Sequence, residues 1–391
     1  MKKRSGALLA LSTAALGLPG MLPKTAQAQA VPDKTTLSYR FTQYTEGGQP
    51  AAVTGGAVVN EAVDRYDISI HQLSVDTALT SSIGLGVHLV TETLSGASPW
   101  YVVEGVDGEP VQIMSGATIE EARDEANASV SYYGESSRIG VGLSYSGEND
   151  YESNGVNVST TLWFNDNNTT LDLGFSFSDD TVSPTQDPLA PGRVLQEDKF
   201  TESAFIGFSQ VINKTLLFGA NASYTVHSGF LSDPYKLASV AGVLQSDSRP
   251  DERQQAALNL QLRKYLPNLD TALHFDYRFY GDNWNISSNT LSLGAYKNIS
   301  SWQLSGKVRF YDQSSASFYR DFYREGRADG FYSSDYRLSQ YDAFSFKMGL
   351  SKSFDFGAVY VSYEDYVSSG NGSNPGLVDF NFATIGMDYK F

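Results

Sequence analysis

The chain has 391 residues, of which 28 are basic and 44 are acidic, and its formal net charge is −16. This acidity, with no basic patch against it, argues against nucleic acid as a partner. There is no cysteine, which excludes disulfide bonds, thiol catalysis and cysteine-ligated metal sites. The mean hydropathy of −0.28 is too low for a bundle of membrane-spanning helices.

The first thirty residues predict a secretory signal peptide. Lys2, Lys3 and Arg4 form a basic start before the apolar run GALLALSTAALGL. That run is too short to span a bilayer comfortably, and no stop-transfer segment follows it. Two Ala-x-Ala motifs suit signal peptidase, so we expect cleavage after Ala28 or Ala30. Loss of the four basic residues of the leader gives a mature charge of −16 − 4 = −20.

From residue 31 to the end, apolar and polar residues alternate with a period of two. In SIGLGVHLVTE, Ile83, Leu85 and Val87 share one side of a strand, whereas Gly84 and His88 share the other. The same alternation recurs in RIGVGLSYSGE, TTLDLGFSFSD, LLFGANASYTV, AALNLQLRKYL, TALHFDYRFYG and WQLSGKVRFYD. Segments of about ten residues suit tilted strands that span a membrane. We count about sixteen of them, within a range of roughly fourteen to eighteen.

The connections between these strands are short and long in turn. Short polar turns such as GESS, NDNN, INKT and SKSF alternate with connectors that are often much longer. The long ones lie near residues 46–62, 92–124, 179–198, 229–253 and 312–336. In a strand meander this places short turns at one end and long loops at the other, which is typical of outer-membrane barrels. We therefore predict an all-β protein whose single domain, residues 31–391, is an antiparallel up-and-down β-barrel in the outer membrane of a Gram-negative bacterium.

The chain ends in TIGMDYKF, an alternating strand that closes on an aromatic residue. Ile385, Met387, Tyr389 and Phe391 are expected to face lipid, with the last two in the periplasmic aromatic girdle. A terminal Phe on such a strand is similar to the signal that the barrel-assembly machinery reads. We therefore expect Tyr389 and Phe391 to serve as the assembly signal.

A series of blocks resembles one proteobacterial family. They include TLSGASPW, NNTTLDLGFSFSDD, GFLSDPYK, SRPDERQQAALNL, DYRFYGDNWNISSNTL, VRFYDQSSASFY and SSDYRLS, in this order along the chain. Together they resemble the family catalogued as domain of unknown function thirty-five-seventy, from about residue 35 to the C-terminus. The resemblance implies an outer-membrane β-barrel, and it implies no activity, cofactor or site residue.

Two histidines and a carboxylate suggest a metal site. If the hairpin turns at residues 78–79, His71 and His88 lie diagonally across from each other, and both face inward with Asp67. Imidazole and carboxylate groups suit zinc or copper. The alternative is that both histidines are simply hydrated in the lumen, and this reading is preferred. No cofactor is expected.

The same hairpin also offers an arrangement of nucleophile and base. A serine nucleophile needs a base within hydrogen-bond reach and a group that orients the base. On this register Ser69 lies opposite His88, with Asp67 nearby. Serine is common on inward positions of any polar lumen, so an outer-membrane hydrolase is the least favoured alternative and we expect no enzyme.

The charges expected in the lumen carry the main functional hypothesis. By alternation, the basic residues that face inward are Arg263, Arg278, Lys307, Arg309 and Lys347, and the acidic ones are Asp67, Asp172, Asp355 and Asp388. Charges inside a barrel must be hydrated or paired. If they are hydrated, the protein is a porin-like channel for small polar solutes. If they are paired, it is a plugged barrel with a structural or assembly role, whose loops bind a partner.

Three loop segments allow further expectations. The segment TIEEARDEA begins with a capping box formed by Thr118 and Glu121, which predicts a short loop helix. SDPYKLASVAG predicts another, with Pro234 in its first turn. The loop QSSASFYRDFYREGRADGFYSSDY either constricts the mouth of the barrel or presents a surface to a partner or to lipopolysaccharide. Other expected partners are outer-membrane lipid and the barrel-assembly machinery.

Overall fold

The computed structural model of the protein describes residues 30–53, 58–63, 65–114, 119–186, 192–370 and 375–391. The predicted leader, residues 1–30, therefore lies outside the described residues except for Ala30. No helix among these residues is long and apolar enough to cross a bilayer.

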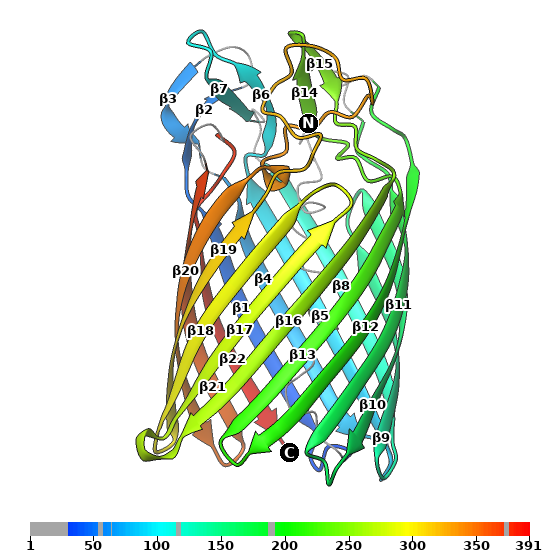
Figure 1. Cartoon of the computed structure of the whole chain (residues 1–391), viewed down its shortest axis with the longest axis vertical. Coiled ribbons are helices and arrows are strands. Elements are labelled where there is room, and N and C mark those ends of the chain that lie inside the picture. Colours follow the sequence, from blue (N-terminus) through cyan, green and yellow to red (C-terminus); the bar gives the residue numbers. More distant parts are fainter. Residues whose placement is uncertain (1–29, 54–57, 64, 115–118, 187–191, 371–374) are drawn as a thin grey trace.

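The described chain forms a closed barrel of sixteen antiparallel strands (Figure 1). Each barrel strand pairs with the barrel strand before and after it in the chain, and β1 closes the ring by pairing with both β4 and β22. The strands are β1 (Thr36–Glu46), β4 (Asp67–Ala78), β5 (Ile83–Gly96), β8 (Ile119–Tyr133), β9 (Ser137–Gly147), β10 (Tyr151–Phe164), β11 (Thr169–Val182), β12 (Glu197–Asn213), β13 (Leu216–Gly229), β16 (Glu252–Leu266), β17 (Thr271–Asp282), β18 (Ser287–Ile299), β19 (Trp302–Gln313), β20 (Tyr341–Phe354), β21 (Gly357–Gly370) and β22 (Phe380–Lys390). The predicted fold class is confirmed.

The register divides every strand into an outward and an inward row of side chains. Residues paired across neighbouring strands share a face, so Leu89, Leu73 and Tyr39 form one outward row. These apolar side chains are exposed, as Leu89 at 43% illustrates, and exposed apolar residues on this surface suit contact with lipid. The inward row includes Tyr44 and Ile68. These two residues are paired across β1 and β4 and are buried together beneath the loops.

The two ends of the barrel differ in their connections (Figure 1). At one end the strands are joined by the short turns 79–82, 134–136, 165–168, 214–215, 267–270, 300–301 and 355–356. At the other end lie the described residues 47–53, 58–63, 65–66, 97–114, 148–150, 183–186, 192–196, 230–251, 283–286, 314–340 and 375–379. We refer to these as the turn end and the loop end.

The long loops carry small sheets of their own. In one sheet β3 (Val58–Val63), β2 (Gln49–Val53), β7 (Pro110–Met114) and β6 (Pro99–Glu104) are neighbours in that order, and β14 (Leu237–Val240) pairs with β15 (Val243–Ser246). Two 3-10 turns are present, η1 (Pro267–Leu269) and η2 (Tyr336–Leu338). Both predicted loop helices are wrong. TIEEARDEA belongs largely to β8, where barrel pairing outweighs the local capping pattern, and the SDPYKLASVAG segment contains β14.

The C-terminus lies at the turn end, where it seals the barrel. Phe391 and Thr35 exchange two backbone hydrogen bonds, each 3.0 Å long. The ring of Phe391 contacts that of Tyr389, which in turn contacts Phe356. Phe391 is 63% exposed, so this aromatic group is directed away from the protein interior, as expected of residues at a membrane interface.

Candidate functional site in the barrel

Basic side chains gather on one side of the lumen. The five predicted positions all lie on the inward face of the strands β16 to β20, namely Arg263, Arg278, Lys307, Arg309 and Lys347. Lys307 and Lys347 are direct partners across β19 and β20. The inward row continues from Lys347 to Glu364 and then to Phe382 and Tyr44.

Some of these charges are paired within the wall. Arg263 Nη2 lies 2.5 Å from Asp276 Oδ1, and Lys347 Nζ lies 3.6 Å from Glu364 Oε2. Ser345 also donates to Glu364, at 2.8 Å. The Lys347 side chain nevertheless remains 43% exposed although it faces inward. Side chains of the described residues therefore do not fill the barrel at this level.

The adjoining wall, strands β9 to β13, is lined mainly by small residues. Asp172, Gly207, Asn221 and Asn259 are successive partners in the row that ends at Arg278, so both walls belong to one inward surface. The inward positions of this wall include Gly140, Gly142, Ser144, Gly155, Asn157, Ser159, Gly174, Ser176, Gly207, Gly219 and Asn221, and the bulky exceptions include Arg138, Trp163 and Phe205. Short side chains on these strands leave more of the lumen open beside the long basic side chains of β16 to β20.

The four predicted acidic positions do not all line the lumen. Asp172 faces inward and accepts a hydrogen bond of 2.7 Å from Thr161, and Asp388 faces inward opposite Ser38. Asp355 lies instead in the exposed turn between β20 and β21, because the strand ends at Phe354. Asp67 shares the outward face with Leu73, which corrects its predicted inward position.

The hairpin of β4 and β5 also differs from its predicted register. Its turn spans residues 79–82, so His88 lies opposite Ser74 rather than Ser69. His71 and Ser69 are consequently outward, whereas His88 is inward, and neither the metal pair nor the serine–histidine pair is brought together. His71 Nδ1 instead lies 2.8 Å from the Tyr39 hydroxyl. Within the described part of the chain, no three His, Asp or Glu side chains converge to hold a metal ion.

At the loop end, buried ion pairs tie two long loops together. Asp335 accepts hydrogen bonds from Arg337 Nε at 2.8 Å and from Arg249 Nη2 at 2.9 Å. Arg249 Nε also donates to Asp247 at 2.6 Å, and Arg337 Nη2 to Asp233 at 2.9 Å. The Asp335 side chain is only 1% exposed. We call these five residues, Asp233, Asp247, Arg249, Asp335 and Arg337, the loop ion network.

The charge balance of this network determines its protonation. Burial alone would raise the pKa of Asp335, but the positive charges of Arg337, Lys236 and Arg249 outweigh burial and hold that pKa well below its usual range. Burial lowers the pKa of Lys236, and Asp335 opposes this shift. The three carboxylates Asp233, Asp247 and Asp335 thus face three cations, which makes burial of the cluster tolerable.

A second junction joins further loops to the same place. Lys236 Nζ donates to the Pro99 carbonyl at 3.0 Å and also lies 5.7 Å from the centre of the Tyr336 ring. The guanidinium of Arg65 lies 5.3 Å from the same ring and pairs with Glu46 at 2.8 Å, where both side chains are fully buried. Five loop-end connections therefore meet around Tyr336, since Arg65 also donates to the carbonyl of Gly376.

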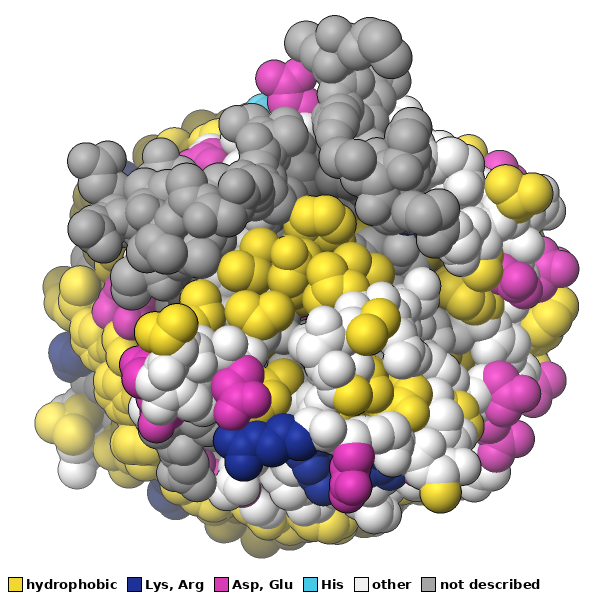
Figure 2. All heavy atoms as spheres, turned by 90° about the horizontal axis from the view of Figure 1, so that it is seen from above, with side chains coloured by type: hydrophobic (Ala, Val, Ile, Leu, Met, Phe, Trp, Pro, Cys, Tyr) yellow, Lys and Arg dark blue, Asp and Glu magenta, His cyan; other side chains and the backbone are white. Residues whose placement is uncertain are grey.

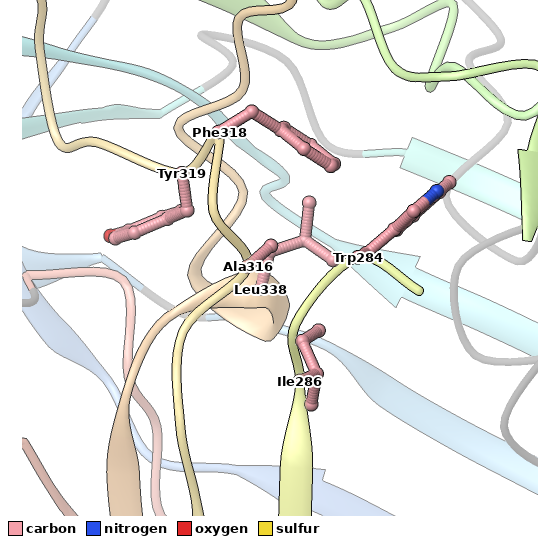
Figure 3. Close-up of a cluster of buried hydrophobic side chains, with 6 residues drawn as sticks. All are labelled: Trp284, Ile286, Ala316, Phe318, Tyr319 and Leu338. Atoms are coloured by element: carbon pink, nitrogen blue, oxygen red, sulfur yellow. The ribbon is translucent and has the colours of Figure 1, made fainter. Parts of the chain in front are cut away.

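An apolar cluster supports the longest of these loops (Figure 3). Trp284, Ile286, Ala316, Phe318, Tyr319 and Leu338 are buried together. The rings of Trp284 and Phe318 meet edge to face at 5.2 Å, and the Trp284 indole donates to the Glu252 carbonyl at 2.9 Å. Residues 314–340 thus have a packed core of their own. The described loops extend over the barrel mouth and gather apolar side chains near its middle (Figure 2).

Sequence reasoning missed the loop ion network. In the loop QSSASFYRDFYREGRADGFYSSDY, which the sequence singles out, Arg324 pairs with Glu104 and Arg327 with Asp329, and both carboxylate side chains are 41% exposed. The available sign was the Asp-x-Arg spacing of Asp335 and Arg337, in which the carboxylate caps η2 by accepting from the Arg337 backbone N–H. Asp247 and Arg249 have the same Asp-x-Arg spacing in the loop 230–251, but neither motif indicates that the two pairs meet.

Comparison with solved structures shows the same kind of barrel. Similar chains include "Bacterial polysaccharide outer membrane secretin", with a TM-score of 0.51 and 10% identity over 93% of this chain and 100% of that chain. Others are "CymD monoaromatic hydrocarbon channel" (TM-score 0.44, 12% identity, 92% and 89%) and OpdK of Pseudomonas aeruginosa with vanillate (TM-score 0.43, 12% identity, 93% and 99%). At these identities the likeness concerns the fold alone, which is that of bacterial outer-membrane barrels.

Sequence comparison gives the family. No curated protein matches the chain in sequence. A family model described as "Protein of unknown function (DUF3570)" matches residues 8–381, and this match confirms the resemblance seen in the sequence blocks. Because the match spans nearly the whole chain, the protein belongs to the DUF3570 family.

Proposed function

We propose that the protein is an outer-membrane channel for small polar solutes, with a mouth narrowed by its folded loops. The observation that carries this proposal is the half-exposed Lys347 on the inward face. A charged side chain inside a barrel is stable when water or a counter-charge solvates it. Its carboxylate partner Glu364 is 3.6 Å away, a separation that leaves both groups room for water.

The asymmetric lumen supports the same conclusion. A barrel of sixteen strands is wide enough for an aqueous interior when one wall carries short side chains. Charges that line such an interior bias permeation by sign without making it absolute, because they are screened over about 8–10 Å at physiological salt. Among the described strands, β16 to β20 give this lumen its positive side. We call their five inward basic residues, Arg263, Arg278, Lys307, Arg309 and Lys347, the basic arc.

Planar-bilayer recording tests the channel directly. The purified folded protein should give unitary conductance steps, and Lys307→Glu should move the reversal potential in a salt gradient toward cation preference. Lys352→Glu is the matched control, because Lys352 lies on the outward face beside Trp302 and should leave the reversal potential unchanged. Folded, inserted protein that gives no conductance would contradict the proposal.

The second candidate is a plugged barrel whose loops bind a partner. It is favoured by the buried ion network that joins loops across the mouth, and by exposed apolar residues on the β15 edge, such as Val243 and Leu244. The two functions differ in one result. A plugged barrel conducts only after the loop ion network is broken, whereas a narrowed channel conducts in the wild type as well.

A further inference from the structure

Two lumenal arginines lack the carboxylate partners that their neighbours have. Arg263 pairs with Asp276, Lys347 with Glu364, and Arg253 with Asp282. Among the described residues, neither Arg278 nor Arg309 has a carboxylate oxygen within ion-pair distance. Their guanidinium groups instead lie near tyrosine rings, at 5.8 Å from the centre of Tyr280 and 5.5 Å from that of Tyr311.

The barrel register places the two arginines diagonally across one intervening strand. They lie on β17 and β19, with one strand, β18, between them. Arg278 is the partner of Thr290, and Arg309 is the partner of Ser292, so two hydroxyl-bearing residues occupy the inward face of the intervening strand. The two positive charges are close enough to repel each other.

The surrounding tyrosines do not neutralise this pair. The Tyr280 hydroxyl donates to Asp282 at 2.8 Å, and the Tyr311 hydroxyl donates to Gln313 at 2.6 Å. Both hydroxyl groups therefore donate to residues that lie nearer the loop end, and only the rings face the arginines. The rings limit the positions that the guanidinium groups adopt, which reduces the cost of ordering them when a ligand binds.

We propose that Arg278 and Arg309 form a binding site for an oxyanion group, a carboxylate or a phosphate, of a small solute in the lumen. A guanidinium group presents parallel N–H donors that match the two oxygens of such a group. An anion between two arginines also removes their mutual repulsion, and Thr290 and Ser292 supply hydroxyl donors at the same level. The site rests on the proposed function, because a solute reaches it through an aqueous lumen.

Calorimetric titration of the folded barrel in detergent tests the site apart from conduction. The probes are acetate and inorganic phosphate, so that the two arms distinguish a carboxylate from a phosphate preference. Binding of at least one probe is expected, and the double variant Arg278→Gln/Arg309→Gln should weaken it by about tenfold or more. Arg278→Lys/Arg309→Lys keeps the charge and loses the paired donors, so its affinity should lie in between.

The control removes a lumenal arginine without changing the net charge. Arg263→Gln/Asp276→Asn deletes an ion pair between β16 and β17, the strand that also carries Arg278, and should leave probe affinity unchanged. Absence of binding to either probe, or equal binding by the double glutamine variant, would overturn the site. A barrel that conducts but binds neither probe refutes the site alone, and one that binds a probe but never conducts refutes the channel alone.

Discussion

Arg249 Nη2 and Asp335 Oδ2 lie 2.9 Å apart, and this contact joins two loops that are 86 residues apart in the chain. One loop follows β13 and the other follows β19, and both lie over the barrel mouth. The pair is buried, so the removal of either charge leaves the network with an unbalanced charge in a poorly solvated place. The position of the loops over the mouth therefore depends on the loop ion network.

Asp335→Asn should loosen the loops over the mouth. The change leaves Arg249 and Arg337 short of one negative charge, and breaking a buried pair costs on the order of 3–5 kcal/mol. Proteolysis of residues 314–340 should become faster, and conductance in bilayers should rise, while the barrel stays folded. Asp329→Asn removes an exposed ion pair with Arg327 in the same loop and should change neither measurement. Equal protease resistance in the two variants would contradict this role for Asp335.

Glu148→Gln should make the free energy of unfolding depend less on pH as the pH rises. Burial, strengthened by the charge of Asp150 and opposed by Arg123, raises the pKa of Glu148 from 4.5 to about 8, and neither of its side-chain oxygens has a hydrogen-bond partner among the described residues. A raised pKa means that the folded state keeps the proton after the unfolded state has lost it. The free energy of unfolding should then fall between pH 4.5 and 8, by an amount on the order of a few kcal/mol.

The measurement is the midpoint of urea unfolding of the detergent-solubilised barrel at pH 5 and at pH 8.5. The wild type should lose stability between these values, whereas Glu148→Gln should lose less. Glu152→Gln changes an exposed glutamate four residues away and should behave as the wild type does. Parallel pH profiles for the wild type and Glu148→Gln would argue against a buried, protonated carboxyl at this position.

Trp284→Ala should unfold the loop core without opening the barrel. The indole packs against Phe318 and lies 4.5 Å from the guanidinium of Arg253, and truncation of a buried tryptophan costs about 3–5 kcal/mol. We expect faster proteolysis of residues 314–340, with unchanged heat-modified migration of the barrel on detergent gels. Trp302→Ala is the control, because Trp302 is exposed on the outward face at the turn end. Loss of the folded band in Trp284→Ala would show that the cluster supports the barrel itself.

Phe391→Ser should reduce the amount of folded protein in the outer membrane. The substitution keeps the backbone hydrogen bonds to Thr35 and removes the terminal aromatic ring expected to be read during assembly. Folded barrel is quantified by its faster migration in unboiled samples. Phe356→Ser removes another exposed ring that contacts Tyr389, so it separates loss of rim packing from loss of the terminal signal. Similar losses in both variants would assign the effect to rim packing.

The alternation of residues was enough to predict the barrel but not the direction of every side chain. Along β4, Leu73 faces lipid whereas Ile68 and Ile70 face inward, because they pack beneath the loops with Tyr44. An apolar residue predicts the lipid side only within the membrane band. If Ile68 and Ile70 are assumed to face lipid, their neighbour His71 is assigned to the lumen, which is the wrong side. A shift of one residue in the assumed alternation changes the face of every side chain in a strand.

The loops were less predictable because their stability comes from contacts distant in sequence. Asp335 meets Arg249, Lys236 meets Pro99, and Arg65 meets Tyr336, and no local spacing indicates these pairs. The basic arc is different. Its residues alternate strictly with lipid-facing neighbours such as Val308 and Phe346, so their common inward side followed from the sequence.

Thr36 and Lys390 are partners across β1 and β22, although 390 − 36 = 354 residues separate them. All other neighbouring strands in the ring follow one another along the chain. Bringing the ends of so long a segment together has an entropic cost, and until β22 pairs with it β1 has a free edge that another chain can occupy. The order of the strands along the chain thus leaves one vulnerable seam. A circular permutant with residues 36 and 390 linked, and new ends at the turn 300–301, would move that seam to β18 and β19 while keeping every strand pair.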